Sequence, residues 1–211
     1  METLIIKDTS LAKTEKDKYL QIVQENTCKL SVLVEQLFQY TKLEANQVVP
    51  EKEQLPLNEL ASDILIAYQL KAKERSIKLL LDTEDKLPAV FTDIALTERV
   101  LQNLLDNAFK FTPDHGSITI QLNQVAGGIK IKVADNGIGI VPEELVYIFE
   151  RYKQFETGEY NKKGMGIGRA IVKKIMELHH ASIEVISEPG KGTAFLFVLT
   201  SFSKTIAIPA L

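Results

Sequence analysis

Two adjacent segments with alternating apolar and polar residues constrain the fold of this chain more than any other feature. "SITIQLNQV" (117–125) and "GIKIKVAD" (128–135) both follow the two-residue period of a strand that is buried on one face. Gly127 and Gly128 lie at the junction of the two segments, and this pair is typical of a hairpin turn. The region around the two segments is therefore predicted to be mixed α/β.

Helical periodicity and the residues that begin or end helices predict the neighbouring elements. A helix is expected over 58–74, and a second from about residue 93 to 111, where Pro113 and Gly116 end it. A short helix should follow Pro142, and a longer one should follow the glycines of "GMGIG". The further strands are expected at "SIKLLLD", "AVF", "SIEVISE" and "TAFLFVLT", and the polar residues 151–163 are expected to form a loop.

The first 48 residues are predicted to be a separate helical region. Apolar residues recur along it at the spacing of a helix bundle or dimer interface, namely Val23, Leu30, Leu33, Leu37 and Tyr40. The alternative is an amphipathic helix that packs on its own domain. Two prolines and several charges then predict a linker at 49–56, followed by a domain at 57–203 and a tail at 204–211.

Composition and charge exclude several classes of protein. With a net charge of −3 and a pI near 5.7, the chain has no basic signature for a nucleic-acid partner. A single cysteine, Cys28, excludes an internal disulfide framework and fits a reducing compartment. The sequence shows neither the pattern expected of a signal peptide nor an apolar run near the roughly 18 residues that span a bilayer. We therefore expect a cytoplasmic chain without a membrane segment.

The second predicted helix carries an unusual polar stripe in "NLLDNAFKFT". Asn103, Asn107 and Lys110 are spaced i, i+4 and i+7, so they share one face. Buried amides and ammonium groups are costly unless a partner satisfies them. Magnesium with phosphates would satisfy Asn107, and Lys110 is long enough to reach the phosphates. The alternative is a polar stripe that faces solvent.

Asp135 continues the buried phase of its strand, in which Ile129, Ile131 and Val133 precede it. A carboxylate on a buried face needs a hydrogen-bond donor, and the exocyclic amine of adenine is a suitable one. Gly137 and Gly139 follow directly and allow the backbone to approach a ligand closely. The alternative is a structural aspartate that caps a turn.

Three glycines in "GMGIG" precede the last predicted helix. Glycine-rich turns at a helix N-terminus leave amide groups free to hold phosphate, although a flexible hinge is the alternative. Their spacing is that of neither a dinucleotide fingerprint nor a Walker loop. Arg169 follows in the first helical turn, where the helix dipole disfavours a cation. Either a bound polyphosphate offsets this cost or Arg169 is a solvated surface residue.

The order of these motifs resembles the catalytic domain of sensor histidine kinases of two-component systems. Asn-x-x-x-Asn-Ala-x-Lys-Phe-Thr, Asp-x-Gly-x-Gly, "FERY", Gly-x-Gly-x-Gly and "GKGTAF" are similar in sequence and spacing to that family's five motifs over about 55–200. The resemblance implies the Bergerat ATP-binding fold, a two-layer α/β (α+β) sandwich of a mixed sheet backed by helices. It implies ATP and Mg²⁺ as cofactors, and an ATP lid between Phe149 and Gly164.

The resemblance also implies roles for individual residues. Asn107 and Asn103 would hold Mg²⁺, and together with Lys110 on the phosphates they are the candidate catalytic residues. Asp135 would bind the adenine amine with Thr193 behind it. The other candidate nucleotide-binding residues are Phe111, Gly137, Gly139, Ile140, Arg151, Gly164, Met165, Gly166, Ile167 and Gly168, with Ile148 as further pocket lining.

The N-terminal region is similar to the second helix of that family's dimerisation and phosphoacceptor domain. The His-Glu/Asp-x-x-x-Pro box of the family does not occur in this sequence, and His115, His179 and His180 lie elsewhere. His180 stands where a helix end favours glycine or asparagine, which predicts a strained left-handed backbone. The chain is therefore expected to bind ATP without phosphorylating itself.

The resemblance then implies that the γ-phosphoryl goes to a histidine outside this chain and on to an aspartate of a response-regulator receiver domain. The chain is expected to be a piece of a longer kinase, which would be a homodimer and could be the cytoplasmic part of a membrane-bound sensor. A natural short kinase is the alternative. The incomplete stem argues against dimerisation of this chain alone.

Three other functions remain open at this point. An ATP-driven switch of the gyrase, chaperone and mismatch-repair type would carry a catalytic glutamate where Asn103 stands. A serine kinase or anti-sigma regulator of the same superfamily would lack the helical stem over 19–45. A scaffold with an inactive pocket would not keep all the nucleotide motifs.

Overall fold

The computed structural model of the protein describes residues 13–84, 86–151 and 166–201. The helices in this part of the chain are α2 (Lys13–Glu44), α3 (Leu57–Glu74), α4 (Ile94–Phe111), α5 (Pro142–Leu145) and α6 (Gly168–Leu178). The strands are β1 (Glu53–Leu55), β2 (Lys78–Thr83), β3 (Val90–Thr92), β4 (Ser117–Val125), β5 (Gly128–Asp135), β6 (Ile183–Glu188) and β7 (Gly192–Thr200).

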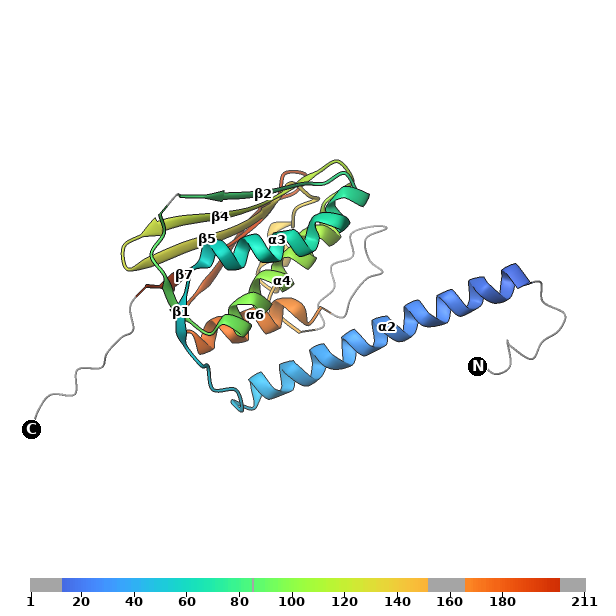
Figure 1. Ribbon diagram of the computed structural model, residues 1–211, viewed down its shortest axis with the longest axis horizontal. Helices are drawn as coiled ribbons and strands as arrows, with labels where there is room; N and C mark the ends of the chain where they lie inside the picture. The colour runs from blue at the N-terminus through green and yellow to red at the C-terminus, as the bar shows by residue number, and fades with distance from the viewer. Residues whose placement is uncertain (1–12, 85, 152–165, 202–211) are drawn as a thin grey trace, which may run out of the picture.

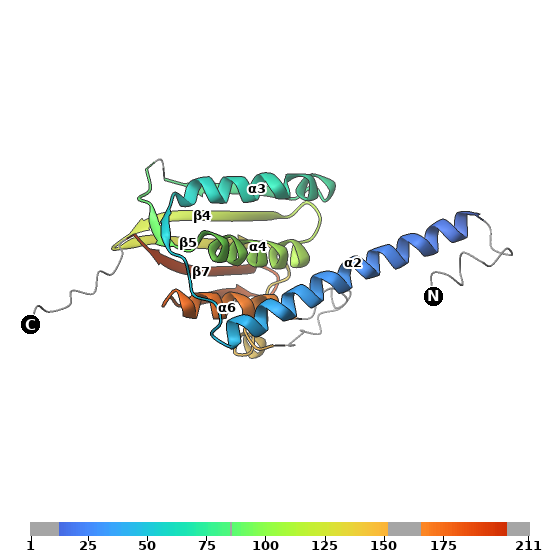
Figure 2. The same cartoon turned by 60° about the horizontal axis from the view of Figure 1, so that its bottom comes forward.

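Five strands form a mixed sheet in the order β2-β4-β5-β7-β6. Only β2 and β4 pair in parallel, and the other neighbours are antiparallel. The predicted hairpin between β4 and β5 closes where Val125 pairs with Gly128. Helices α3, α4 and α6 lie side by side against one face of the sheet (Figures 1 and 2). The predicted two-layer sandwich of a mixed sheet backed by helices is therefore confirmed.

The core lies between the sheet and these three helices. Alternate residues of β4 and β5 are almost fully buried, namely Ile118, Ile120, Leu122, Ile129, Ile131 and Val133. They face buried leucines of α4 such as Leu101, Leu104 and Leu105. Burying an aliphatic side chain of this size contributes about 1.5–3 kcal/mol. This contact fixes α4 and the end of β5 relative to each other, which matters for the site below.

One strand was not expected from the sequence. Residues 53–55 lie inside the predicted linker, but they form β1 and pair antiparallel with β3 from Glu53–Thr92 to Leu55–Val90. Leu55 and Val90 are both buried in this small second sheet. Three residues are too few to show a two-residue period, and the partner strand is far away in the sequence. No local sequence pattern therefore predicts the pairing of β1 with β3.

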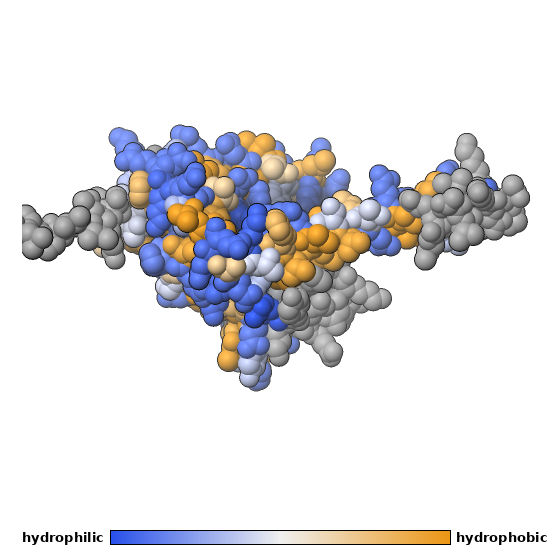
Figure 3. Space-filling model, turned by 90° about the horizontal axis from the view of Figure 1, so that it is seen from below, coloured by the Kyte–Doolittle hydropathy of each residue, from blue (hydrophilic) through white to orange (hydrophobic). Residues whose placement is uncertain are grey.

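Helix α2 leaves the domain and carries exposed apolar side chains along its length (Figures 1 and 3). These exposed residues are Tyr19, Leu20, Ile22, Leu30, Val32, Val34, Leu37 and Phe38. Only its last turns pack on the domain, where Tyr40 and Leu43 are buried. The alternative of a helix packed along its own domain is thus wrong for most of α2, and Tyr40 belongs to the core rather than to the seam.

The structure bears on two predictions, one about Cys28 and one about membrane segments. Cys28 is an exposed residue of α2 and forms no disulfide. Among the described residues, no helix combines the length and the hydropathy that crossing a bilayer requires.

Helix α6 ends in a Schellman motif. The His180 amide donates to the Glu177 carbonyl at 3.0 Å, and the Ala181 amide donates to the Met176 carbonyl at 2.9 Å. His180 adopts φ +54°, which confirms the left-handed backbone predicted for this residue. The carbonyls of Met176 and Glu177 in the last turn of α6 are therefore satisfied by the chain itself.

Candidate functional site

A small cavity lies between α4, α6 and the ends of β5 and β7. Its lining consists of Asn107, Phe111, Asp135, Ile140, Arg169, Thr193 and Phe195. The structure thus brings together five of the candidate nucleotide-binding residues with Arg169, which the sequence left open between a polyphosphate site and the surface, and with Phe195, which was not expected. The cavity measures about 20 Å³, close to the space of one water molecule. An adenine ring can enter only if side chains in the wall move.

Asp135 holds a fixed position at the base of the cavity. It pairs with Thr193 across β5 and β7, and its Oδ1 accepts hydrogen bonds from the amides of Gly137 (2.9 Å) and Thr193 (3.3 Å). Within the described part of the chain, no donor is bonded to Oδ2. Burial raises the pKa of the Asp135 carboxyl, and the two amides oppose this shift. The carboxylate therefore has one satisfied oxygen and one that can accept a hydrogen bond from a ligand.

Thr193 supports Asp135 through its backbone amide, whereas its hydroxyl lies 2.9 Å from the Ser187 hydroxyl. Ser187 also accepts a hydrogen bond from the Ile140 amide at 2.9 Å and so ties the glycine loop to β6. Ser187 was not among the residues predicted from the sequence. The alternation of residues along β6 could have predicted that the Ser187 side chain points inward, because Ile183, Val185 and Ser187 share the less exposed face of this strand.

The loop after Asp135 needs glycine for two reasons. Gly139 adopts φ +68°, and a Cβ added there would lie 2.1 Å from the Glu188 carbonyl oxygen. At Gly137 an added Cβ would lie 2.4 Å from the Phe111 carbonyl oxygen. The close approach is therefore to the chain's own backbone, and it holds Ile140 at the cavity wall.

The polar stripe of α4 divides between two environments. Asn107 faces the cavity, and its amide makes no hydrogen bond with any described residue. Asn103 instead donates from its amide to the Arg99 carbonyl at 2.8 Å. Its Oδ1 lies so near the start of α6 that a Cβ on Gly168 would be 2.6 Å away. The alternative of a stripe that faces solvent is wrong, because Asn103, Asn107 and Lys110 are all partly buried.

The donor set of the cavity fits a hard cation that brings its own oxygen ligands. Among the described residues there is no group of three or more His, Cys, Asp or Glu side chains that could hold a metal by themselves. An amide oxygen such as that of Asn107 suits Mg²⁺, which is usually bound by one or two protein oxygens together with phosphates and water.

Lys110 and Arg169 are close enough for their charges to interact, and Arg169 lines the cavity. Lys110 is half-buried, with its Nζ 4.9 Å from the centre of the Phe111 ring. Burial lowers the pKa of the Lys110 ammonium, and the charge of Arg169 lowers it further. The Lys110 ammonium is therefore partly shielded from water and lies within reach of a second positive charge.

Arg169 is 7% exposed, so the alternative of a solvated surface arginine is wrong. Burial lowers the pKa of its guanidinium to about 10, which leaves it charged at neutral pH, and the Glu144 carboxylate opposes the shift. Its burial depends on how α6 packs against α4, which no local pattern in the sequence shows.

The glycine box is only partly described. Gly164 and Met165 lie outside the described residues, so their predicted role in nucleotide binding stays a prediction. Gly166 adopts φ +70°, and Gly168 begins α6, whose N-terminus has no side-chain cap. Ile167 and Ile148 are both buried in the core, and neither is among the residues that line the cavity.

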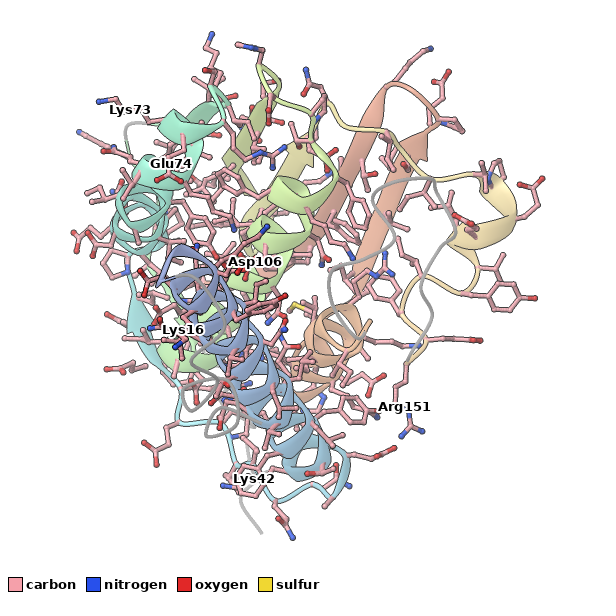
Figure 4. The ribbon with its side chains drawn as sticks, turned by 90° about the vertical axis from the view of Figure 1, so that its right-hand side faces the viewer. Lys16, Lys42, Lys73, Glu74, Asp106 and Arg151 are labelled. Carbon is pink, nitrogen blue, oxygen red and sulfur yellow. The ribbon has the colours of Figure 1, made fainter. Side chains whose placement is uncertain are left out.

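Arg151 lies at a different place from the other candidate residues. Its guanidinium is 3.1 Å from the Glu44 carboxylate and 5.2 Å from the centre of the Tyr40 ring. Figure 4 shows Arg151 beside the last turns of α2, far from Lys73 and Glu74 at the end of α3. It lines a second cleft, between α2 and α6, with Tyr40 and Lys174. The structure does not bring Arg151 to the cavity, and its contact with nucleotide stays a prediction.

A mixed sheet backed by helices, with a partly buried carboxylate, a free amide and a buried guanidinium around one cavity, defines the class of ATP-binding α/β sandwiches. Comparison with known proteins agrees. The model of the histidine kinase-, DNA gyrase B-, and HSP90-like ATPase family matches residues 92–201, and the chain belongs to this family.

Two curated relatives cover most of this chain. Drug sensory protein A of Synechocystis sp. is 30% identical over 218 residues, which cover 99% of this chain and 33% of that protein. The adaptive-response sensory kinase SasA of the same organism is 34% identical over 168 residues, which cover 79% of this chain and 44% of that protein. The chain thus spans between a third and a half of these two relatives.

Two solved structures are similar to most of this chain in fold. Full-length ShkA in complex with AMPPNP has a TM-score of 0.78 at 25% identity, over 93% of this chain and 41% of that one. The nucleotide-free catalytic domain of ThkA has a TM-score of 0.62 at 26% identity, over 72% of this chain and 96% of that one. The prediction of an ATP-binding catalytic portion of a sensor histidine kinase is confirmed, and the other functions are not favoured.

Proposed function

We propose that this chain binds Mg-ATP in the cavity between α4 and α6 and donates the γ-phosphoryl to a histidine. The observation that carries the proposal is the position of Asp135. Its carboxylate is held by two backbone amides, it keeps one oxygen for a ligand, and it shares the cavity with Asn107. A carboxylate that is costly to bury is retained where a ligand compensates for it.

Asp135 would recognise the base. Its Oδ2 accepts a hydrogen bond from the exocyclic amine of adenine, while the Gly137 and Thr193 amides hold Oδ1 and prevent the carboxylate from rotating. Phe111, Ile140 and Phe195 supply apolar surface for the ring. A charge-assisted hydrogen bond in a site shielded from water gives both affinity and selectivity.

Asn107 and Lys110 would organise the phosphates. The Asn107 amide oxygen coordinates Mg²⁺, with Asn103 beside it, and the Lys110 ammonium contacts a phosphate oxygen. The metal, once bound, would supply charge neutralisation for the phosphates. Positioning and charge neutralisation are the main sources of catalysis in phosphoryl transfer.

The transfer itself breaks the bond between the γ-phosphorus and the bridging oxygen, forms a phosphorus–nitrogen bond to the acceptor imidazole and releases ADP. The acceptor would belong to a histidine box, which the sequence printed here does not contain. The phosphoryl group would then move to an aspartate of a response regulator. A second copy of α2 would cover the exposed apolar residues of the first in a homodimer.

A phosphotransfer assay tests the proposal. The chain is mixed with γ-labelled ATP, Mg²⁺ and a separately purified dimerisation domain that carries a histidine box from a sensor kinase. We expect label on that domain only when this chain is present, and the label should be lost in acid and kept in base, as for phosphohistidine. Asn107→Ala should abolish the transfer, whereas the exposed Asn58→Ala should not.

Two other results would contradict this proposal. Release of inorganic phosphate without any labelled protein would indicate an ATP-driven switch. Acid-stable label would indicate a serine kinase.

A further inference from the structure

Three polar side chains form a row across the sheet at the base of the cavity. Asp135 on β5 pairs in register with Thr193 on β7, and Thr193 pairs in register with Ser187 on β6. Residues that are directly opposite each other in antiparallel strands place their side chains on the same face of the sheet. Asp135 and Thr193 line the cavity, whereas Ser187 lies behind Thr193 on the edge strand. Ser187 is therefore placed to affect a ligand through Thr193 rather than by direct contact.

The hydrogen-bonding capacity of the Ser187 hydroxyl is fully used. A hydroxyl has one proton to donate and two lone pairs that accept. Ser187 Oγ donates its proton to the Gly192 carbonyl at 2.9 Å and accepts a hydrogen bond from the Ile140 amide at 2.9 Å. Its third contact is the Thr193 hydroxyl, also at 2.9 Å. Because the single proton of Ser187 already goes to a carbonyl, which cannot donate in return, the Thr193 hydroxyl is the donor in this contact.

This assignment fixes the direction of the Thr193 proton. The proton points along the sheet to Ser187, and the lone pairs of Thr193 Oγ1 remain to accept hydrogen bonds. Among the residues that the structure describes, Ser187 is the only hydrogen-bond partner of this hydroxyl. On the neighbouring strand, Asp135 keeps its Oδ2 as a second acceptor. Asp135 and Thr193 thus both offer acceptors to a ligand at this end of the cavity.

We propose that Ser187 is a positioning residue for base selection. By accepting the Thr193 proton it keeps the Thr193 hydroxyl as an acceptor, so the site favours a purine with a 6-amino group over one with a 6-oxo group. An exocyclic amine can donate one hydrogen to Asp135 and the other to Thr193, directly or through a water molecule. A carbonyl oxygen in the same place would meet two acceptors with no proton between them. The inference rests on the proposed function and assigns part of its base selectivity to a residue outside the cavity lining.

A second role of the same hydroxyl has to be separated from this one. Ser187 also holds the glycine loop through the Ile140 amide, so its loss should loosen the cavity wall. Ile140 offers only apolar side-chain surface to the base, and a looser wall would weaken the binding of all purine nucleotides to a similar degree. The ratio of the affinities for ATP and ITP therefore isolates the positioning role, because ITP carries a carbonyl oxygen where ATP carries the amine.

The first test compares Ser187→Ala with Ser182→Ala. The second variant is the matched control, because it removes an exposed hydroxyl just before the same strand. Calorimetry with Mg²⁺ measures ATP binding, and competition against ATP measures ITP binding. In Ser187→Ala the Thr193 hydroxyl can rotate and donate into the cavity, so the preference for ATP over ITP should narrow about tenfold, as for one hydrogen bond. Ser182→Ala should keep the wild-type ratio.

A double-mutant cycle tests whether Ser187 acts through Thr193. Thr193→Val keeps the branched shape of the side chain and removes its hydroxyl, so this variant should itself narrow the ratio. Adding Ser187→Ala to Thr193→Val should change the ratio no further, because no hydroxyl remains to be reoriented. If Ser187→Ala does not fold, Ser187→Cys replaces it. The thiol is similar in size but is a weak acceptor, so the ratio should narrow in the same direction.

Three results would overturn the inference. They are an unchanged ratio in Ser187→Ala or Ser187→Cys, an equal narrowing in Ser182→Ala, and a further narrowing when Ser187→Ala is added to Thr193→Val. If the wild-type chain itself bound no ATP, the proposed function would fail instead. ATP binding by the wild type with an unchanged ratio in Ser187→Ala would overturn this inference alone, which distinguishes the two failures.

Discussion

The two ends of α6 differ in how their polar groups are satisfied. At its C-terminus the chain closes the helix itself, through the Schellman bonds of His180 and Ala181. His179 adds a link there, because its Nδ1 lies 2.9 Å from the Ile175 carbonyl and the Asp93 amide donates to its Nε2 at 3.4 Å. The N-terminus has no side-chain cap and places Arg169 in the wall of the cavity.

Because of this difference, we expect one end of α6 to contribute to the stability of the fold and the other end to contribute to nucleotide affinity. The C-terminal end is complete without a ligand, so changes there should alter the free energy of unfolding and leave nucleotide affinity alone. The N-terminal end and the cavity carry charged groups that burial disfavours, so changes there should alter nucleotide affinity and cost little stability. The next four predictions test this contrast, starting from the largest effect.

The largest effect is expected for Asp135→Asn. The amide presents no charged acceptor to the adenine amine, so ATP affinity should fall about 30- to 100-fold by calorimetry. Since burial raises the pKa of this carboxyl, the ionised form costs stability above the unfolded pKa, and the variant should unfold at an equal or higher temperature. The substitution Asp63→Asn, at an exposed residue, is the control. A large loss of stability in Asp135→Asn would contradict the expectation that changes in the cavity cost little stability.

Asn107→Ala should remove the contribution of Mg²⁺ to the affinity for ATP. We expect Mg²⁺ to strengthen ATP binding by the wild type, and the variant to lose about tenfold in affinity with Mg²⁺ present but little without it. Titrations with and without EDTA measure this. A similar loss under both conditions would show that Asn107 contacts the nucleotide directly or only supports the wall.

His179→Ala should act on stability alone. The variant loses the two hydrogen bonds of the imidazole, which should lower the free energy of unfolding by about 2 kcal/mol at pH 7.5. Burial lowers the pKa of His179, the hydrogen bond to the Ile175 carbonyl and the charge of Asp93 oppose this shift, and the charges of Lys52 and His180 add to it.

The sign of the pH effect follows from that shift. The unfolded chain binds the proton more tightly, so the contribution of His179 is complete above its unfolded pKa of 6.5 and is lost as the pH falls below it. Urea unfolding at pH 7.5 and 5.5 should show the wild type approaching the variant at the lower pH. A weaker ATP affinity in His179→Ala would contradict the separation of the two ends.

The smallest effect is expected for His180→Gly. Glycine adopts φ +54° without the steric cost that a side chain imposes, so the variant should be more stable by about 0.5–1 kcal/mol. Chemical denaturation measures the gain, and nucleotide affinity should not change. His115→Gly offers a comparison, because His115 also has a positive φ but lies in a turn rather than in a Schellman motif.

The sequence predicted the parts of the fold whose signals are local. The strands 117–125 and 128–135 and the helix that ends at Phe111 all lie where periodicity placed them. Strand β1 was missed because it is three residues long and its partner is remote in the sequence. The exposure of α2 could not be predicted either. The same spacing of apolar residues occurs in a helix whose apolar face packs on its own domain and in one whose apolar face is exposed to solvent.

The site divides in the same way. The inward position of Asp135 followed from the phase of its own strand, and Asn107 from the phase of its helix. The burial of Arg169, the turn of Asn103 toward Gly168 and the pairing of Arg151 with Glu44 all depend on how separate elements pack. Contacts between separate elements leave no periodic pattern in the sequence. They can therefore be seen only in the structure.

The choice between ATP and GTP tests the central claim most directly. Guanine carries a carbonyl oxygen where adenine carries its amine, and that oxygen would face the Asp135 carboxylate with no proton between them. Calorimetry on the wild-type chain with Mg²⁺ should show ATP binding at least about 100-fold more tightly than GTP, and Asp135→Asn should narrow the difference. Equal affinity for the two nucleotides in the wild type would contradict the assignment of Asp135 and of the cavity.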